Sequence, residues 1–164
     1  MATAITYLLS VVSAVTITQN TVEVSTINLS LGDLTINSGV YYSIVNNALT
    51  ALVGTVDNQG GFYVTSANGL AASVTMTGAS FLNAGTLAFN SLTASVLSTY
   101  DIATIGTFLN TGNMYMGISS ATLVGTPFTV TSVSSWSNSG MMVFRRASGS
   151  AGSLVIEQVL GSGG

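Results

Sequence analysis

The chain has 164 residues, enough for one domain with a substantial core, and only 4% of them are charged. Two basic residues cannot supply the several phosphate contacts that nucleic-acid binding needs, so nucleic acid is excluded as a partner. Because the sequence holds no histidine and no cysteine, the usual ligands of zinc, haem and iron–sulfur clusters are missing, and we expect no metal and no other cofactor.

The first segment with a recognisable pattern is an apolar run from Ile5 to Ala14, which ends in the small-residue sequence VSA. This pattern predicts a secretory signal peptide over residues 1–14, with cleavage after Ala14. No basic residue follows Met1, so a first β-strand is the alternative interpretation. The run is shorter than the about 20 residues that cross a bilayer, so we expect no transmembrane segment. Residues 15–164 are then expected to form the folded domain.

From residue 37 onward the chain repeats a short phrase, Asn-x-Gly, five times, each followed by alternating apolar residues. The phrases supply the pairs Asn37 and Gly39, Asn58 and Gly60, Asn83 and Gly85, Asn110 and Gly112, and Asn138 and Gly140. Successive asparagines are 21, 25, 27 and 28 residues apart, a period typical of a solenoid in which each repeat is one coil. The alternation and the abundance of Thr, Val, Ser and Gly favour strands over helices. The sequence thus predicts an all-β fold, a parallel β-helix of about five to six coils.

When the repeats are aligned on their asparagines, apolar residues fall at the same positions in each coil. Two residues before the asparagine stand Val56, Phe81, Phe108 and Trp136, with Thr35 as the exception in the first coil. Two and four residues after the glycine stand Phe62 and Val64, Leu87 and Phe89, Met114 and Met116, and Met142 and Phe144. Because residues two apart share one face of a strand, these side chains are expected to stack inside the solenoid. The first coil fits this alignment poorly, since it offers Tyr41 and Ser43.

The asparagine and glycine of each phrase have a structural reason to recur. Each coil must turn a sharp corner, and both residue types tolerate a positive φ. Stacked asparagine side chains also form hydrogen bonds from one coil to the next. We therefore interpret the five pairs as structural corner residues.

The outward face of the strand after each glycine is the candidate contact surface. It carries, in coil order, Tyr42, Tyr63, Ala88, Tyr115 and Val143. One interpretation is an aromatic strip that stacks on sugar rings or on an apolar surface, and the alternative is ordinary sheet surface, where tyrosine is favoured in any case. Arg145 and Arg146 either pair with an anionic partner or are solvated loop cations.

The carboxylates do not suggest an active site. They are scattered over different coils and different positions of the repeat, as Glu23, Asp33, Asp57, Asp101 and Glu157. A glycosidase generally needs two carboxylates that flank one bond, and the sequence offers no such pair. Asp57 adjoins a corner asparagine, where a turn-forming role is the better interpretation. We therefore expect no catalytic residue and no enzymatic activity.

Several of these phrases together resemble a known family. Residues 83–102 and 107–116 resemble, in phrase order and spacing, the N-terminal domain of the hyphally regulated cell wall protein family of yeasts. Residues 135–143 and 34–42 resemble further coils of the same domain, and the resemblance covers roughly residues 15–160.

This resemblance implies a secreted, adhesin-like wall protein whose N-terminal domain is a right-handed parallel β-helix. It further implies, beyond Gly164, a small β-sandwich-like subdomain, a glycosylated Ser/Thr-rich stalk and a glycolipid (GPI) anchor signal. Residues 15–164 are accordingly expected to be a fragment of a longer extracellular protein, anchored in the cell wall through regions beyond the chain. Asn28 begins the one N-glycosylation sequon, Asn-Leu-Ser, which matters if the chain is secreted.

Two functional hypotheses follow from different classes of protein. The first is an adhesin-like module that mediates cell-surface adhesion or cell-wall structure, with host-cell glycans, wall glycans or abiotic surfaces as partners and with self-association between rods. The second is a carbohydrate-binding or polysaccharide-degrading β-helix, which would require convergent carboxylates in one groove. A phage or bacterial surface β-helix explains the architecture equally well but leaves the family resemblance to coincidence.

Overall fold

The computed structural model describes residues 13–24, 28–46, 49–66, 72–91, 98–118, 128–146 and 154–158. These residues form eighteen β-strands and no helix. The expected signal peptide lies almost entirely outside the described residues, and so does the chain after β18. The strands assemble into three parallel sheets, each of six strands.

The strands follow one another around the three sheets in strict rotation, so that each coil supplies one strand to each sheet. Sheet A contains β1 (Val15–Ile17), β4 (Leu34–Ile36), β7 (Val56–Asn58), β10 (Ser80–Asn83), β13 (Thr107–Asn110) and β16 (Ser135–Asn138). Sheet B contains β2 (Thr21–Val24), β5 (Tyr41–Val45), β8 (Gly61–Ser66), β11 (Thr86–Ser91), β14 (Asn113–Ile118) and β17 (Met141–Arg146). Sheet C contains β3 (Leu29–Leu31), β6 (Leu49–Leu52), β9 (Ser73–Met76), β12 (Tyr100–Thr104), β15 (Phe128–Ser132) and β18 (Leu154–Gln158).

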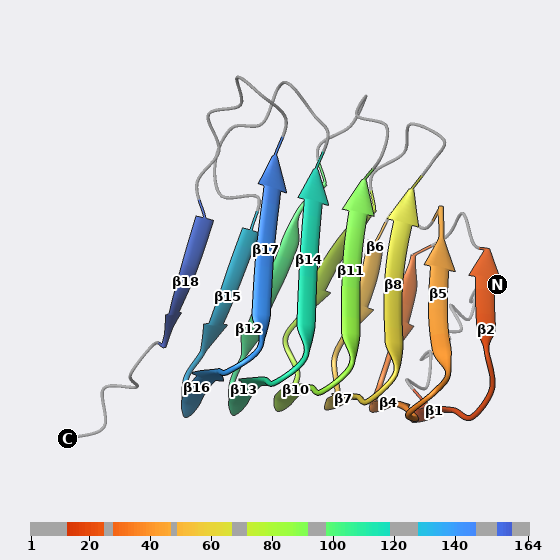
Figure 1. The fold of residues 1–164 in the computed structure, drawn as a ribbon, viewed down its shortest axis with the longest axis horizontal. Helices are drawn as coiled ribbons and strands as arrows, with labels where there is room; N and C mark the ends of the chain where they lie inside the picture. Colours follow the sequence, from red (N-terminus) through yellow and green to blue (C-terminus); the bar gives the residue numbers. More distant parts are fainter. Residues whose placement is uncertain are drawn as a thin grey trace, which may run out of the picture.

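The solenoid is right-handed. In Figure 1 the strands of sheet B lie in front and point upward, those of sheet C lie behind and point downward, and sheet A lies below. The chain meanwhile advances from the N-terminal coil at the right to the C-terminal coil at the left. A path that rises in front, descends behind and advances leftward turns as a right-handed helix, so the predicted fold class is confirmed.

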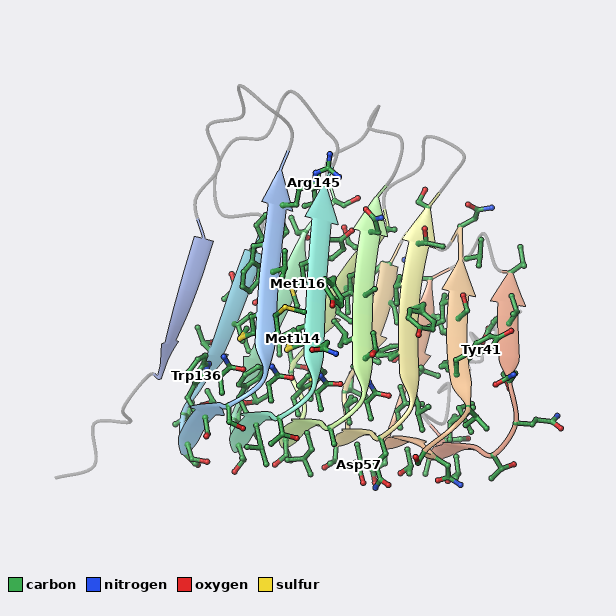
Figure 2. All side chains as sticks on the ribbon, viewed as in Figure 1. Tyr41, Asp57, Met114, Met116, Trp136 and Arg145 are labelled. Carbon is green, nitrogen blue, oxygen red and sulfur yellow. The ribbon has the colours of Figure 1, made fainter. Side chains whose placement is uncertain are left out.

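The core is built from ladders of like residues, as the repeat predicts. Phe81 pairs in register with Phe108, and Phe108 with Trp136. The rings of the first pair lie 5.6 Å apart at 5°, and those of the second pair 5.5 Å apart at 17°. Stacked aromatic pairs contribute about 0.5–1.5 kcal/mol each beyond the area they bury. Figure 2 shows Met114 and Met116 of β14 in the same interior, behind sheet B.

The coil that contains Asn37, the first of the sequence repeats and the second coil of the structure, obeys the same pattern as the others, but its predicted alignment is wrong by one residue. Ile36 pairs with Asn58, and Tyr42 pairs with Phe62. Four residues, 37–40, connect β4 to β5, whereas only Gln59 and Gly60 connect β7 to β8. Because the first connection is longer by two residues, an alignment on Asn37 shifts both flanking strands to the wrong face.

The asparagines form a hydrogen-bonded ladder along the inner edge of sheet A. Asn58 Nδ2 donates to Asn83 Oδ1 at 2.7 Å, Asn83 Nδ2 to Asn110 Oδ1 at 2.7 Å, and Asn110 Nδ2 to Asn138 Oδ1 at 2.6 Å. The first three of these side chains are buried. Coil-to-coil hydrogen bonding is therefore confirmed for four of the five predicted asparagines. Asn37 is exposed and is not in the ladder, because Ile36 occupies that position.

The ladder does not extend into the coil that contains β4, the second in the structure. Asn58 Oδ1 is buried and accepts no hydrogen bond from the described residues, because its neighbour in β4 is Ile36. A buried acceptor without a donor costs about 1–3 kcal/mol. The amide ladder thus begins at Asn58, because the second coil, which contains β4, has an isoleucine at this position.

The predicted positive φ is confirmed for Gly39, but the other four corner glycines recur for a different reason. Among the described residues, only Gly39 (φ 78°) and Asn46 (φ 62°) have left-handed backbone. A Cβ on Gly85, Gly112 or Gly140 would lie 2.0 Å from the carbonyl oxygen of the preceding corner glycine. A Cβ on Gly60 would lie 2.1 Å from Val40 O. Only glycine lets successive corners stack this closely.

A second corner of the same kind, between sheets C and A, was missed by the sequence reasoning. A Cβ on Gly78 would lie 1.7 Å from Gly54 O, and one on Gly106 would lie 2.1 Å from Ala79 O. Gly32, Gly54, Gly78 and Gly106 are spaced 22, 24 and 28 residues apart, which is nearly the period of the Asn-x-Gly phrase. This spacing could have revealed the second corner in the sequence, but no recurring residue, such as the asparagine of the first corner, stands beside these glycines.

Gly85→Ala is predicted to destabilise the fold by about 3 kcal/mol or more, because the new methyl group meets backbone atoms that cannot move aside. Gly39→Ala is the matched control, since nothing lies within 4 Å of its added Cβ. It should cost only about 1 kcal/mol, the penalty for left-handed backbone. Urea unfolding of the two variants measures the difference, and equal losses would contradict the stacking argument.

Asn83→Ala is predicted to cost about 2–4 kcal/mol, because it leaves Asn58 Nδ2 and Asn110 Oδ1 without their amide partners in the core. Asn138→Ala should cost about 1 kcal/mol, since Asn138 lies exposed at the end of the ladder. The same unfolding measurement tests both variants. A loss at Asn83 no larger than that at Asn138 would show that the ladder does not act as a continuous chain.

Candidate functional site

The described carboxylates do not converge on one site. Glu23 lies on β2 and accepts a hydrogen bond from the Tyr42 hydroxyl. Asp33 Oδ1, at the corner between sheets C and A, accepts from Thr55 N at 2.8 Å. Asp57 Oδ2, on β7, accepts from the side-chain amide of Gln59, Nε2, at 3.1 Å. These three side chains thus have structural partners.

The other two carboxylates lie on sheet C. Asp101 is on β12, on the outer face, between Thr75 and Thr129 in the register. Partial burial raises its pKa above the ordinary aspartate value. Glu157 is on β18, beside Thr131 in the register. No group of three acidic, histidine or cysteine residues that would hold a metal ion occurs in the described parts of the chain.

Tyr42 does not belong to the predicted contact strip. Its side chain is only 3% exposed and faces the core, as the register with Phe62 requires. The two rings lie 6.1 Å apart and nearly parallel, at 5°. Burial raises the pKa of the Tyr42 hydroxyl, and the hydrogen bond to Glu23 raises it further. Tyr42 therefore closes the N-terminal part of the core and presents nothing to a ligand.

The outward row that includes the other two tyrosines runs through all six strands of sheet B. In register it consists of Val22, Ser43, Tyr63, Ala88, Tyr115 and Val143. Tyr63 is half-buried beside Tyr41, with ring centroids 6.1 Å apart, whereas Tyr115 is 38% exposed. The predicted strip is thus interrupted at Ala88. The exposed residues of the row are Val22 at its N-terminal end and Tyr115 and Val143 toward the C-terminal coils.

The C-terminal part of this face, on β14 and β17, is apolar and nearly uncharged. Tyr115, Val143 and Met141 are respectively 38%, 40% and 44% exposed on neighbouring strands β14 and β17. Arg145 is the one charged side chain that the described strands of sheet B direct outward, and it is exposed. Figure 2 shows it at the upper end of β17, beside β14. We call Tyr115, Met141, Val143 and Arg145 the C-terminal patch of sheet B.

A shallow hollow of about 170 Å³ adjoins this patch. Its lining residues are Ala88, Phe89, Asn90, Tyr115, Met116, Gly117, Val143 and Arg145. It exists because Gly117 has no side chain and Ala88 has a small one, while the strands around them carry longer residues. The sequence reasoning did not find this hollow, because Asn90, Gly117 and Arg145 become neighbours only through the strand register.

Two further predicted features can be placed. Asn28 is exposed immediately before β3, so its side chain is accessible to a glycosyltransferase. Arg145 and Arg146 end strand β17 and do not lie in a loop. Within the described ranges, no helix is long and apolar enough to span a bilayer.

The fold and this surface define a right-handed β-solenoid with an outward strip that is uncharged apart from one arginine. The chain belongs to the hyphally regulated cell wall protein family, whose N-terminal domain profile matches residues 5–163. The family and the names of its members give the cell wall as the location, so the chain is a domain of a cell wall protein.

Curated relatives come from Candida albicans. The chain is 42% identical to Cell wall protein RBR3 over 94% of its own length, and 38% identical to Cell wall protein IFF6 over 85%. It is 36% identical to Hyphally regulated cell wall protein 3 over 91% of its length. The aligned region covers only 10%, 13% and 12% of these three relatives, respectively. No solved structure gives a significant match.

Asp101→Asn is predicted to raise the melting temperature at pH 7 and to leave it unchanged at pH 3. Because burial raises the folded-state pKa of Asp101, its ionised form is disfavoured in the fold. That cost is present above the folded-state pKa and vanishes below the unfolded value of about 3.9. Thermal melts across this range measure the effect, with Asp57→Asn as the control for net charge. A stabilisation that persists at pH 3 would contradict the assignment.

Proposed function

We propose that the chain is a non-catalytic adhesive module of a fungal cell wall protein, and that it makes contact through the C-terminal patch of sheet B. The observation that carries this proposal is the exposure of Tyr115, Met141 and Val143 side by side on a face whose described strands direct a single charged side chain outward. Membership of the wall protein family supports an outward-facing location.

The chemistry of the patch suits contact with a broad range of surfaces. Apolar and aromatic side chains gain free energy when water leaves them, at about 25 cal/mol per Å² of apolar area. A face with few charges avoids the large cost of desolvating unpaired ions. Tyrosine adds a ring that stacks on flat groups and a hydroxyl that hydrogen-bonds. The patch therefore favours adhesion over chemical turnover.

The solenoid supplies the rigidity that such a contact needs. The outward residues are fixed by a continuous parallel sheet, so few of them lose freedom on binding. Glycosylation at the exposed Asn28 would fall immediately before β3, at the N-terminal end of the solenoid and several coils away from the C-terminal patch. The low coverage of the relatives is consistent with display on a longer, anchored protein. Secretion, glycosylation and a GPI anchor are part of this proposal.

The test is adhesion of cells that display the chain on a neutral stalk, measured in parallel on a glycan array, on mammalian cell layers and on plastic. The double substitution Tyr115→Ser and Met141→Ser should reduce adhesion about tenfold, because it removes two of the three exposed apolar side chains of the C-terminal patch. Ile105→Ser is the matched control, since Ile105 is 66% exposed at the corner between sheets C and A.

Thermal melts of the displayed variants confirm that they fold. Reduced adhesion of the double variant with normal adhesion of Ile105→Ser would support the patch as the contact surface. Equal adhesion of all three chains would remove sheet B from consideration, and absence of adhesion by the unmodified chain would recast it as a spacer or coat element.

A further inference from the structure

The hollow beside the C-terminal patch contains polar groups in an arrangement that the adhesion proposal does not use. Asn90, Gly117 and Arg145 occupy adjacent positions in one outward row of sheet B. With strands about 4.8 Å apart, an amide and a guanidinium therefore flank a glycine across about 10 Å. One step along the strands, the next row places Ala88, Tyr115 and Val143 beside them.

The polar side chains of this hollow retain their hydrogen-bonding capacity. Among the described residues, no partner hydrogen-bonds to the side chains of Asn90 or Tyr115, and none forms an ion pair with Arg145. Asn90 Oδ1 lies 2.8 Å from the point where a Cβ of Gly117 would stand, so this amide extends over the glycine. A side chain at position 117 would occupy the space that the hollow leaves open.

These groups match the parts of one kind of ligand. A guanidinium binds a carboxylate through two parallel hydrogen bonds, and it does so best where no other carboxylate competes. An asparagine amide both donates to and accepts from hydroxyl groups. The ring of Tyr115 and the methyl groups of Val143 suit the apolar C–H face of a pyranose. Together they describe a sugar ring that carries a carboxylate.

We propose that the hollow formed by Asn90, Tyr115, Gly117, Val143 and Arg145 binds a single carboxylated sugar residue, such as a uronic or a sialic acid. At about 170 Å³ the hollow is smaller than the about 300–1,000 Å³ of sites that enclose drug-sized ligands, so it accepts one ring and not a longer chain. The proposal rests on the proposed adhesive function and names a ligand class for the same face.

Binding at one such hollow is expected to be weak. A single charge-assisted pair and one stacked ring correspond to a dissociation constant of about 1 mM. Adhesion therefore requires many copies of the chain on one cell to bind at the same time. Affinity should fall as salt rises, because the ion pair is exposed. Such weak, multivalent recognition is compatible with the broader apolar contact.

The experiment is an NMR titration of the full chain with methyl glucuronide, 3′-sialyllactose and the neutral methyl glucoside. At least one acidic sugar should bind tenfold or more tightly than methyl glucoside, and the pair of acidic probes distinguishes the two sources of the carboxylate. Shifts should centre on the backbone amides of Asn90, Gly117 and Arg145. Equal binding of acidic and neutral sugars, or shifts elsewhere, would overturn the proposal.

Substitutions test separately how the charge of Arg145 and the open space of the hollow contribute to sugar binding. Arg145→Gln should abolish the preference for the acidic sugar, and Arg146→Gln, which makes the same change in net charge, should preserve it. Gly117→Ala should weaken binding of all sugars, because its Cβ displaces the flexible Asn90 side chain without touching backbone. An acidic tripeptide that binds as tightly as the sugars would show that only the carboxylate is read, and would also overturn the proposal.

The outcome is distinguishable from that of the adhesion test. If Arg145→Gln loses the acidic sugar while adhesion to plastic persists, both proposals stand. If no acidic sugar binds but Tyr115→Ser with Met141→Ser still reduces adhesion, only the present inference fails.

Discussion

Every other feature of this molecule depends on the coils stacking in register at one strand spacing. Parallel strands about 4.8 Å apart bring each residue directly over its equivalent in the preceding coil. At the corners this spacing leaves about 2.0 Å between a carbonyl oxygen and the point where the next Cβ would stand, so glycine is required there. On the inner edge of sheet A it places one amide within hydrogen-bond distance of the next. In the core it turns single aromatic residues into stacks.

This constraint explains what the sequence reveals and what it hides. A register that repeats identical environments produces repeated residues, so the solenoid, the Asn ladder from Asn58 to Asn138 and the interior positions were predictable. Asn37 stands in an Asn-x-Gly phrase but is not part of the ladder. A longer connection shifts the register of its coil, so that Tyr42 faces the core. The corner glycines were identified correctly but explained by φ, since close approach between coils has no signature in one sequence. Their counterparts between sheets C and A lacked a companion residue that would have marked them.

The candidate site was harder to predict for the opposite reason. Residues at outward positions need not be the same from coil to coil. The hollow arises where three consecutive coils carry different residues, Asn90, Gly117 and Arg145. These residues lie 27 and 28 positions apart and follow no phrase. Only the strand register brings them together. The interior of the solenoid thus carries the repeated architecture, while the outer faces are free to differ from coil to coil.

The asparagine ladder favours changes in the length of the solenoid by whole coils. Asn83 and Asn110 each donate to the coil after them and accept from the coil before them, so the three hydrogen bonds of the ladder point the same way along the axis. Replacement of one asparagine inside the ladder leaves its two neighbours without a partner, because one loses its acceptor and the other loses its donor. Removal or duplication of a whole coil rejoins the amides and leaves none unmatched. The same holds for the stacked glycines and rings, so such a chain lengthens or shortens most easily by entire coils of about 21 to 28 residues.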